Sequence, residues 1–273
     1  MKVSTFVARA IAPSLTVLTL MTPLLSGLAA QPSQAQEVIA LGELHDNPHH
    51  HAEQARRVAE ITPRAIVFEM LSQTQAERVT PALRRDEAAL REALGWDASG
   101  WPDFSMYYPI IEAAPEARIF GAHVPRDAAR TAMEQGAAAV FGAEAGAYGL
   151  DQPLPEDQQQ ARETMQQDAH CNAMPPEMLP ALVEMQRLRD AALARATAEA
   201  LEAVGPPVVV ITGNGHARRD WGLWPYLRAR KPEVTLFALG QLEEGQPMPP
   251  EGAFDALHVS PAAARDDPCD AFR

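Results

Sequence analysis

Cysteine is scarce in this chain of 273 residues, which contains only Cys171 and Cys269. No cysteine precedes Cys171, so the N-terminal segment offers no thiol for a lipid anchor. In an oxidising compartment two cysteines without a competitor form a disulfide by default. We therefore expect a bridge between Cys171 and Cys269. Ligation of a metal or cofactor by the Cys171 thiolate, which follows His170, is the alternative.

Positive charge is also in deficit, because 23 lysines and arginines face 36 acidic residues and the formal net charge is −13. Residues 1–35 carry Lys2 and Arg9 and no acid, so removing these two charges from −13 leaves −15 for the remainder. Recognition of nucleic acid requires a basic face, which excludes that class of partner. An acidic surface also repels anionic lipid headgroups and favours a soluble exported protein.

The first 35 residues have the pattern of a secretory signal peptide: basic residues, then a long apolar stretch through Leu25, then small residues. Pro13 and Pro23 interrupt the apolar stretch and argue against an uncleaved anchor helix. We expect cleavage near residue 30 or 35, with no stable membrane span afterwards. The mature protein, residues 36–273, is predicted to be a periplasmic single domain.

Short apolar runs, each followed by polar or glycine-containing residues, indicate buried strands. They are Val38–Leu41, Ala65–Phe68, Arg118–Phe120 and Val208–Ile211, and later strands are expected at Val234–Phe237 and Phe254–Val259, at an edge of the sheet. Helical patterns cover Pro48–Ile61, Ser72–Leu94, Ser105–Ala114 and Pro125–Gln135. This alternation predicts an α/β fold with a mostly parallel central sheet and helices on both faces. Residues of about 137–205 depart from this alternation of strands and helices and are predicted to form a helical insertion. The insertion either forms a lid over the strand ends or packs against the sheet.

Residues 42–51 gather acidic and imidazole groups directly after the first strand. Asn47 as N-cap and Pro48 at the first helical position predict a helix start, which places Glu43 and His45 in the turn. Binding groups collect at the carboxyl ends of strands in open α/β sheets, so a functional role is predicted for this pair. His50 and His51 are expected to be solvated residues of the helix start.

Polar groups follow the other strands as well, and the carboxyl ends of parallel strands converge. The converging groups are Glu43, His45, Glu69, His123 and His216. Imidazole and carboxylate are ligands for divalent metals such as manganese, cobalt or zinc, and an uncoordinated glutamate can serve as a general base. A metal-dependent hydrolase that uses Glu43, His45, Glu69 and His216 is therefore one hypothesis, although no stand-alone metal signature such as His-Glu-x-x-His is present.

The segment Gly213-Asn214-Gly215-His216 adds a second indication of a site. Two glycines around Asn214 permit close approach of a ligand to the backbone, and Arg218 and Arg219 lie just beyond, where they could meet carboxylates. Five of the chain's sixteen aromatic residues fall between Trp96 and Tyr108, a density that suits a large flat apolar ligand such as haem as well as an ordinary core. Trp221, Trp224 and Tyr226 could line the same cavity.

These segments together resemble the ChaN-like haem-binding uptake proteins, which belong with the Tiki, TraB and erythromycin-esterase-like proteins in one superfamily. The resemblance runs from about Glu37 to Gly240. Its most specific parts are Gly42–His50, Phe68–Met70, Trp101–Pro109, Val124–Arg126, His170–Cys171 and Gly213–Arg218 with Trp224–Pro225 behind it. Two departures are the missing N-terminal cysteine of lipoprotein relatives and His123, which stands where the family pattern has asparagine.

The resemblance implies an α/β fold and, for the ChaN-like branch, haem binding at a homodimer interface and a role in iron acquisition. On the aromatic segment and the resemblance together, the candidate axial ligands are Tyr107, Tyr108 and His216. Candidates near the haem propionates are Arg126, Arg218 and Arg219, and Asn214 is a further candidate for cofactor binding. The Tiki branch instead implies metal-dependent peptide hydrolysis by a Gly-x-x-His motif with glutamates, which Gly42, His45, Glu43 and Glu69 match. Haem binding is the leading hypothesis and a peptidase or esterase the alternative.

Overall fold

The computed structural model describes residues 36–267, 269 and 270, and these form one six-stranded parallel sheet with helices on both faces. The strands are β1 (Val38–Glu43), β2 (Ala65–Phe68), β3 (Arg118–Gly121), β4 (Val208–Gly213), β5 (Leu236–Glu243) and β6 (Ala256–Ser260). Their order is β3-β2-β4-β1-β5-β6, and every neighbouring pair is parallel. The predicted α/β fold with a parallel sheet is confirmed, whereas the predicted signal peptide lies outside the described residues.

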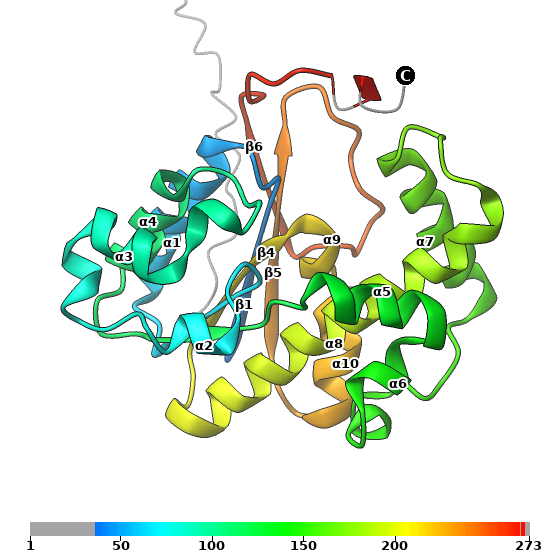
Figure 1. The fold of residues 1–273 in the computed structure, drawn as a ribbon, viewed down its shortest axis with the longest axis horizontal. Helices are drawn as coiled ribbons and strands as arrows, with labels where there is room; N and C mark the ends of the chain where they lie inside the picture. The colour runs from blue at the N-terminus through cyan, green and yellow to red at the C-terminus, as the bar shows by residue number, and fades with distance from the viewer. Residues whose placement is uncertain (1–35, 268, 271–273) are drawn as a thin grey trace, which may run out of the picture.

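Helices cover the sheet in two layers, which Figure 1 separates clearly. The first layer contains α1 (Pro48–Ile61), α3 (Glu87–Leu94) and α4 (Phe104–Glu112), with the short α2 (Gln73–Ala76) nearby. The other side carries α5 (Arg126–Gln135), α6 (Ala137–Phe141), α7 (Glu156–Ala169), α8 (Leu179–Val204) and α10 (Leu223–Arg230), with the single turn α9 (Asn214–Ala217) after β4. None of the helices in the described part of the chain is both long and apolar enough to cross a membrane.

Two apolar cores lie on the two faces of the sheet because successive strand residues point in opposite directions. On β1, Val38 and Ala40 belong to the core under α8 and α10, whereas Ile39 and Leu41 belong to the core under α1 and α4. All six residues of β1 and of β4 are buried. The continuous apolar runs of the sequence are therefore strands covered on both faces.

The predicted helix over Ser72–Leu94 is wrong, because the chain breaks it into separate pieces. The helix α2 ends at Ala76, a 3-10 turn spans Leu83–Arg85, and α3 begins at Glu87 behind the N-cap Asp86. Pro81 lies in the gap, where its ring disfavours helical backbone at Thr80 and its nitrogen has no proton to donate. The apolar residues of Ser72–Leu94 are spaced as in a continuous helix, so their pattern does not indicate the break.

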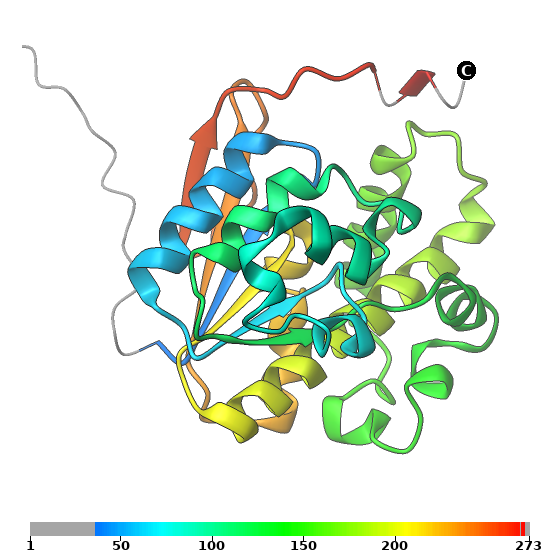
Figure 2. The same cartoon turned by 60° about the vertical axis from the view of Figure 1, so that its left-hand side comes forward.

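The segment of residues 137–205 contains both sheet-covering and peripheral helices. The long helix α8 packs on β2, β3 and β4 and so provides the crossover into β4, whereas α7 packs on α8. The predicted disulfide between Cys171 and Cys269 is confirmed, with the two Cα atoms 5.6 Å apart. It joins the end of α7 to the C-terminal tail, which Figure 2 shows running from β6 across the edge of the molecule toward α7.

Candidate functional site

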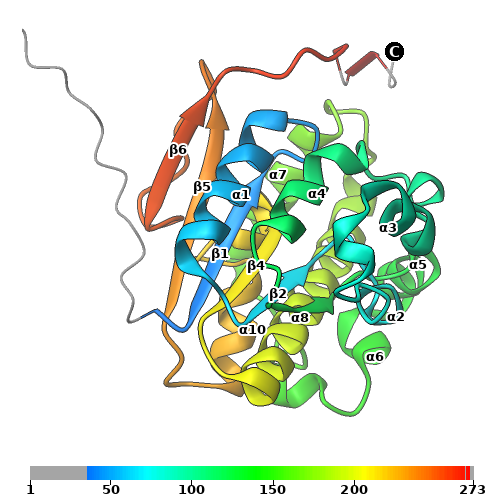
Figure 3. The ribbon, with the colours of Figure 1, turned by 90° about the vertical axis from the view of Figure 1, so that its left-hand side faces the viewer.

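The carboxyl ends of all six strands lie at the same edge of the sheet, as the arrowheads in Figure 3 show. At this edge β1 and β4 are direct neighbours, with Glu43 paired in register with Gly213. The chain leaves β1 into α1 on one face of the sheet and leaves β4 toward α10 on the other face. Divergent connections at adjacent strands open a crevice, which is where parallel α/β sheets bind ligands.

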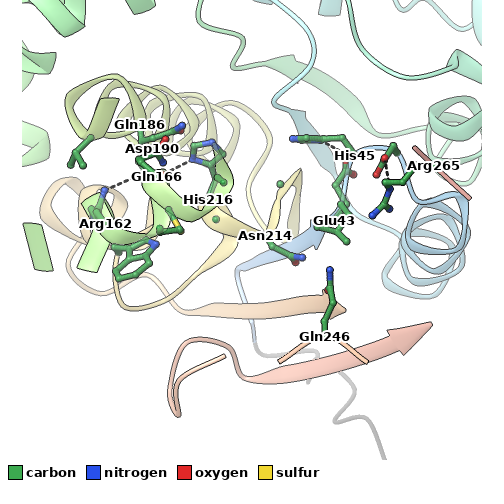
Figure 4. A pocket seen from close by; sticks show the side chains of 18 residues that line it. Glu43, His45, Arg162, Gln166, Gln186, Asp190, Asn214, His216, Gln246 and Arg265 are labelled. Atoms are coloured by element: carbon green, nitrogen blue, oxygen red, sulfur yellow. Dashed lines mark hydrogen bonds and ion pairs between the residues drawn. The ribbon is translucent and has the colours of Figure 1, made fainter. Parts of the chain in front are cut away.

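A cavity of about 640 Å³ occupies this crevice. Its wall is built from the ends of β1 and β4 together with α7, α8 and part of the C-terminal tail. The polar and charged residues that line it include Glu43, His45, Arg162, Gln166, Asp190, Asn214, His216 and Arg265. Figure 4 places Arg162, Asp190 and His216 on one side, His45, Glu43 and Arg265 on the other, and Asn214 between them. The volume lies within the range of small-molecule and cofactor sites.

On the β1 side, Glu43 and His45 form a tightly bonded pair. Nδ1–H of His45 donates to Oε1 of Glu43 at 2.7 Å, and the same oxygen accepts from the Tyr107 hydroxyl at 2.9 Å. Oε2 of Glu43 accepts from the Gln54 side chain at 2.8 Å. Burial alone would raise the pKa of Glu43, but the His45 hydrogen bond and the neighbouring His51 lower it below its usual range. Burial would lower the pKa of His45, yet Glu43 and the charge of Glu69 raise it to about 9.

On the β4 side, His216 lies between two carboxylates. Its Nδ1–H donates to Oδ1 of Asp190 at 2.6 Å, and its Nε2 is 3.7 Å from Oε1 of Glu69. Burial would lower the pKa of His216, but Glu69 and Asp190 raise it. Glu69 accepts hydrogen bonds from the Thr212 hydroxyl at 2.6 Å and the Gly213 N–H at 2.8 Å. Burial opposes its ionisation, and His216, His45 and these hydrogen bonds together lower its pKa to about 2.

These two clusters make the stability of the folded protein depend on pH. Above about pH 4.5 Glu69 contributes its full stabilisation, which is lost as the pH falls toward its folded-state pKa of about 2. The stabilisation from His45 is complete below about pH 6.5 and is lost as the pH rises toward 9. We expect the thermal midpoint to be highest between these limits, measured by scanning calorimetry across the pH range. His45→Gln should flatten the alkaline decline, and a midpoint that rises from pH 6.5 to 9 would contradict the assignment.

The expectation that His50 and His51 are solvated is wrong. Both are buried, at 0% and 1% exposure. Nδ1 of His50 accepts from the Leu44 N–H at 2.9 Å, and Nε2–H of His51 donates to the His45 carbonyl at 2.8 Å. Burial lowers the pKa of His50 to about 4. The two rings hold the turn after β1 in shape, so their role is to position His45.

The predicted tyrosine ligands do not line the cavity. Tyr107 is fully buried at 0% exposure, where it contacts Trp96 and donates to Glu43. Tyr108 is half-buried and its hydroxyl donates to the Arg84 carbonyl at 2.9 Å. The aromatic segment is thus mainly core between α1, α3 and α4. Trp101 is the exception, because its ring stays partly exposed and lies 4.9 Å from that of His45.

The predicted basic residues also lie elsewhere. Arg126 is exposed at the start of α5 and does not line the cavity. Arg218 is bonded to Asp220 and stacks on Trp221, with its guanidinium carbon 3.7 Å from the ring centroid, and Arg219 is paired with Asp255. His123 lines a second cavity of about 470 Å³ between α5, α6 and α8. Of the aromatic residues after His216, Trp221 lines the main cavity, whereas Trp224 and Tyr226 do not.

Asn214 shapes the floor of the cavity by fixing β4 to β5. Its side-chain nitrogen donates to the Gln241 carbonyl at 2.6 Å, and its side-chain oxygen accepts from the Gln241 N–H at 2.9 Å. This oxygen would lie 2.4 Å from a Cβ atom at Gly42, and the Leu239 carbonyl oxygen would lie 2.9 Å from it. Only glycine therefore fits at position 42.

Gly42→Ala is expected to destabilise the protein by about 2 kcal/mol, because the bonded amide of Asn214 cannot move away from the new methyl group. The matched control is Gly215→Ala in α9, just after the neighbouring strand β4, since a Cβ atom there meets nothing within 4 Å. Urea unfolding of the two variants beside the wild type measures the difference. Equal stability of the two variants would show that the Gly42 contact is unimportant.

Glu43 contacts His45 and Glu69 faces His216, and metal binding by these four residues stays a prediction. Within residues 36–267, 269 and 270, no group of three or more histidine, cysteine, aspartate or glutamate side chains is arranged to hold a metal ion. The lone pairs of Glu43 accept from Tyr107, Gln54 and His45, and one oxygen of Glu69 accepts from Thr212 and Gly213. Both oxygens of Glu43 and one oxygen of Glu69 therefore already accept hydrogen bonds within the protein.

Sequence reasoning missed the residues that come from α7, α8 and the tail. Asp190, which bonds to His216, and Arg162, which donates to Oδ2 of Asp190 at 3.1 Å, lie on helices far along the chain from any strand end. Arg265 reaches the opposite rim, where it pairs with Asp46 and Glu243. No local pattern marks them, because only the packing of α7 on α8 brings Arg162 to Asp190.

Comparison of the sequence with protein families matches residues 29–227 to the family described as haem-binding uptake, Tiki superfamily, ChaN. Among solved structures, one described as cofacial haem binding to ChaN of Campylobacter jejuni aligns with a TM-score of 0.61 and 19% identity, covering 82% of this chain and 87% of that one. The type III effector HopBA1 aligns with a TM-score of 0.47 and 13% identity, covering 84% and 90%. Comparison with curated protein sequences gave no match.

Proposed function

The chain belongs to the ChaN family of haem-binding uptake proteins in the Tiki superfamily, and from this premise we propose that it binds haem in the cavity at the ends of β1 and β4. The observation that carries the proposal is a cavity of about 640 Å³ that presents two carboxylate-bound histidines, His45 and His216, beside an apolar wall. Haem requires such a slot together with an axial donor.

The apolar part of the wall suits a flat macrocycle. Leu44, Met165, Ala169, Val183 and Trp221 line the cavity from the β1 turn, α7, α8 and the segment after α9. Burial of a large porphyrin face against such side chains supplies most of the affinity for a ligand of this kind. Tyr107 lies in the core and Tyr108 packs against it, and neither lines this cavity.

His45 is the axial donor that the geometry favours. Its Nδ1 is held by Glu43, and its Nε2 has no hydrogen-bond partner among the described residues. The side chain is 34% exposed, whereas that of His216 is 12% exposed and its Nε2 faces Glu69. A carboxylate behind the ring orients the imidazole and raises its basicity, an arrangement that strengthens histidine as an iron ligand. Nε2 of His45 would hold the iron in its deprotonated form, and Glu43 would keep its bond to Nδ1.

The wider role that we propose is haem uptake by an exported, periplasmic protein. A disulfide in the fold supports export, because such bonds persist in oxidising compartments. We also propose that two copies associate around haem, since the name of the Campylobacter jejuni structure describes cofacial binding. Light scattering of the purified protein with and without haemin tests this part: a mass that doubles on addition of haemin supports the dimer, and an unchanged monomer mass rejects it.

The direct test of haem binding is a spectroscopic titration. Haemin added to the mature protein, residues 36–273, should give a shifted Soret band that saturates at a defined ratio of haemin to protein. Haemin in buffer alone provides the reference spectrum. A spectrum indistinguishable from that of free haemin at stoichiometric protein would overturn the proposal.

A further inference from the structure

Three polar side chains at the α7 end of the cavity are almost fully buried, and two of them have a buried nitrogen without a partner among the described residues. The three are Arg162, Gln166 and Trp221, at 3%, 4% and 9% exposure, and all of them line the cavity. Buried polar groups in folded proteins are nearly always hydrogen-bonded, so the unpartnered Nε of Arg162 and Nε1 of Trp221 in one place indicate a group that arrives from outside the chain.

Arg162 uses only part of its guanidinium within the protein. Its Nη1–H donates to Oδ2 of Asp190 at 3.1 Å, while its Nε is buried with no acceptor among the described residues. A guanidinium has five N–H donors in a planar fork that matches a carboxylate in two-point geometry. Asp190 is shared with His216 and therefore cannot satisfy the whole fork.

Trp221 and Gln166 add neutral hydrogen-bonding groups next to this fork. The buried Nε1–H of Trp221 has no acceptor in the described part of the chain, and the indole ring stacks under Arg162 with 5.5 Å from the guanidinium carbon to the ring centroid. The Gln166 side chain lies one helical turn after Arg162 on α7 and also lines the cavity. An indole N–H can only donate, so an acceptor is what the place lacks.

The charge around this end of the cavity also favours an anion. Burial would lower the pKa of His216, but Glu69 and Asp190 on either side of its ring raise it, and Arg162 pairs with the same Asp190. Arg189 lies near His216 and has no ion-pair partner among residues 36–267, 269 and 270. Arg218 stacks on the other side of Trp221 but is already neutralised by Asp220. Cations thus outnumber acids beside Trp221 even though the whole protein is acidic.

We infer that Arg162, Gln166 and Trp221 form a subsite that binds a carboxylate arm of the ligand held in the cavity. The inference rests on the proposed haem function and deepens it, since the propionates of haem are such arms. This subsite takes the place of the earlier candidates for propionate binding. Those candidates, Arg126, Arg218 and Arg219, are either outside the cavity or already paired. The subsite selects flat apolar ligands that carry a carboxylate over otherwise identical neutral ones.

The test compares iron-free protoporphyrin IX with its dimethyl ester, because the ester removes the charge and the absence of iron removes any contribution from His45. Dissociation constants are measured by porphyrin fluorescence with the full mature protein. The wild type should bind the acid at least about 10-fold more tightly than the ester, the magnitude of one charge-assisted hydrogen bond. Trp221→Phe and Arg162→Gln should each reduce this ratio of affinities toward one.

Trp224→Phe is the matched control, since Trp224 is a neighbouring tryptophan that does not line the cavity. Trp221→Phe keeps the ring and removes only the N–H, so it remains informative if Arg162→Gln fails to fold. Equal affinity of the wild type for acid and ester, with haemin still bound, overturns the subsite and leaves haem binding intact; it means that water alone satisfies these groups. Failure of haemin and both porphyrins to bind overturns the proposed function itself.

Discussion

Replacement of His45 by alanine is expected to lower the affinity for haemin by roughly 100-fold or more. Loss of a group that merely orients a metal ligand costs about 10- to 100-fold in metal affinity, and loss of the ligand itself costs at least as much. The effect should appear as a higher dissociation constant in the Soret titration, together with a change in the band position that reports different axial coordination. Glu43→Gln keeps the shape of the side chain behind the His45 ring but removes its charge. Its affinity for haemin should lie between that of His45→Ala and that of the wild type.

The matched control for this prediction is His49→Ala. His49 is an exposed histidine four residues away, on α1, and it does not line the cavity. The His49→Ala protein should bind haemin with the affinity of the wild type. If His45→Ala also binds as the wild type does while His216→Ala loses affinity, the axial donor is His216 and the assignment to His45 is wrong. Circular dichroism of each variant verifies that the fold is intact.

Loss of the disulfide between Cys171 and Cys269 is expected to destabilise the protein by about 4–5 kcal/mol. The bridge spans 98 residues, and closure of a loop of that length restricts the unfolded chain by about this amount in the chain-entropy model. That is a large part of the total stability of a typical domain. Guanidinium unfolding of the oxidised protein and of the double variant Cys171→Ser with Cys269→Ser measures the difference at equilibrium.

The loosening on loss of the bridge should start in the tail, not in the sheet. The tail keeps a second attachment, because Arg265 pairs with Asp46 and Glu243, and the Asn47 side chain donates to the Pro261 carbonyl at 3.1 Å. Hydrogen exchange should therefore increase first beyond residue 265 and at the end of α7, while β1 and β4 stay protected. A difference of less than about 1 kcal/mol, or exchange that increases first in the sheet, would contradict this account.

The strands and the β1 end of the site were predictable because their signals are local. A buried strand such as Val208–Ile211 is a continuous apolar run, and Asn47 and Pro48 mark the start of α1 in the sequence itself. The N-cap prediction is confirmed, with the Asn47 side chain accepting from the His49 N–H. Glu43 is the last residue of β1 and Glu69 follows β2, and both reach the histidines because parallel strands end at one edge.

The other wall of the cavity was not predictable, since it depends on contacts between segments far apart in the sequence. Asp190 meets His216 across 26 residues and Arg162 across 28, through helix packing that leaves no periodic mark. Burial also reversed two expectations. His50 and His51 have the sequence pattern of solvated residues, yet both are buried, and His50 accepts a hydrogen bond from the turn after β1. Tyr107 was predicted as a ligand, but it is buried and its hydroxyl donates to Glu43.

The most direct test of the central claim is a crystal structure of the haemin complex with the iron located by its anomalous scattering. Our account predicts one iron peak per chain inside the cavity between β1 and α8, within coordination distance of Nε2 of His45, and a propionate directed at Arg162 and Trp221. An iron peak outside this cavity, for example beside Tyr108 on the other face of the sheet, would contradict it.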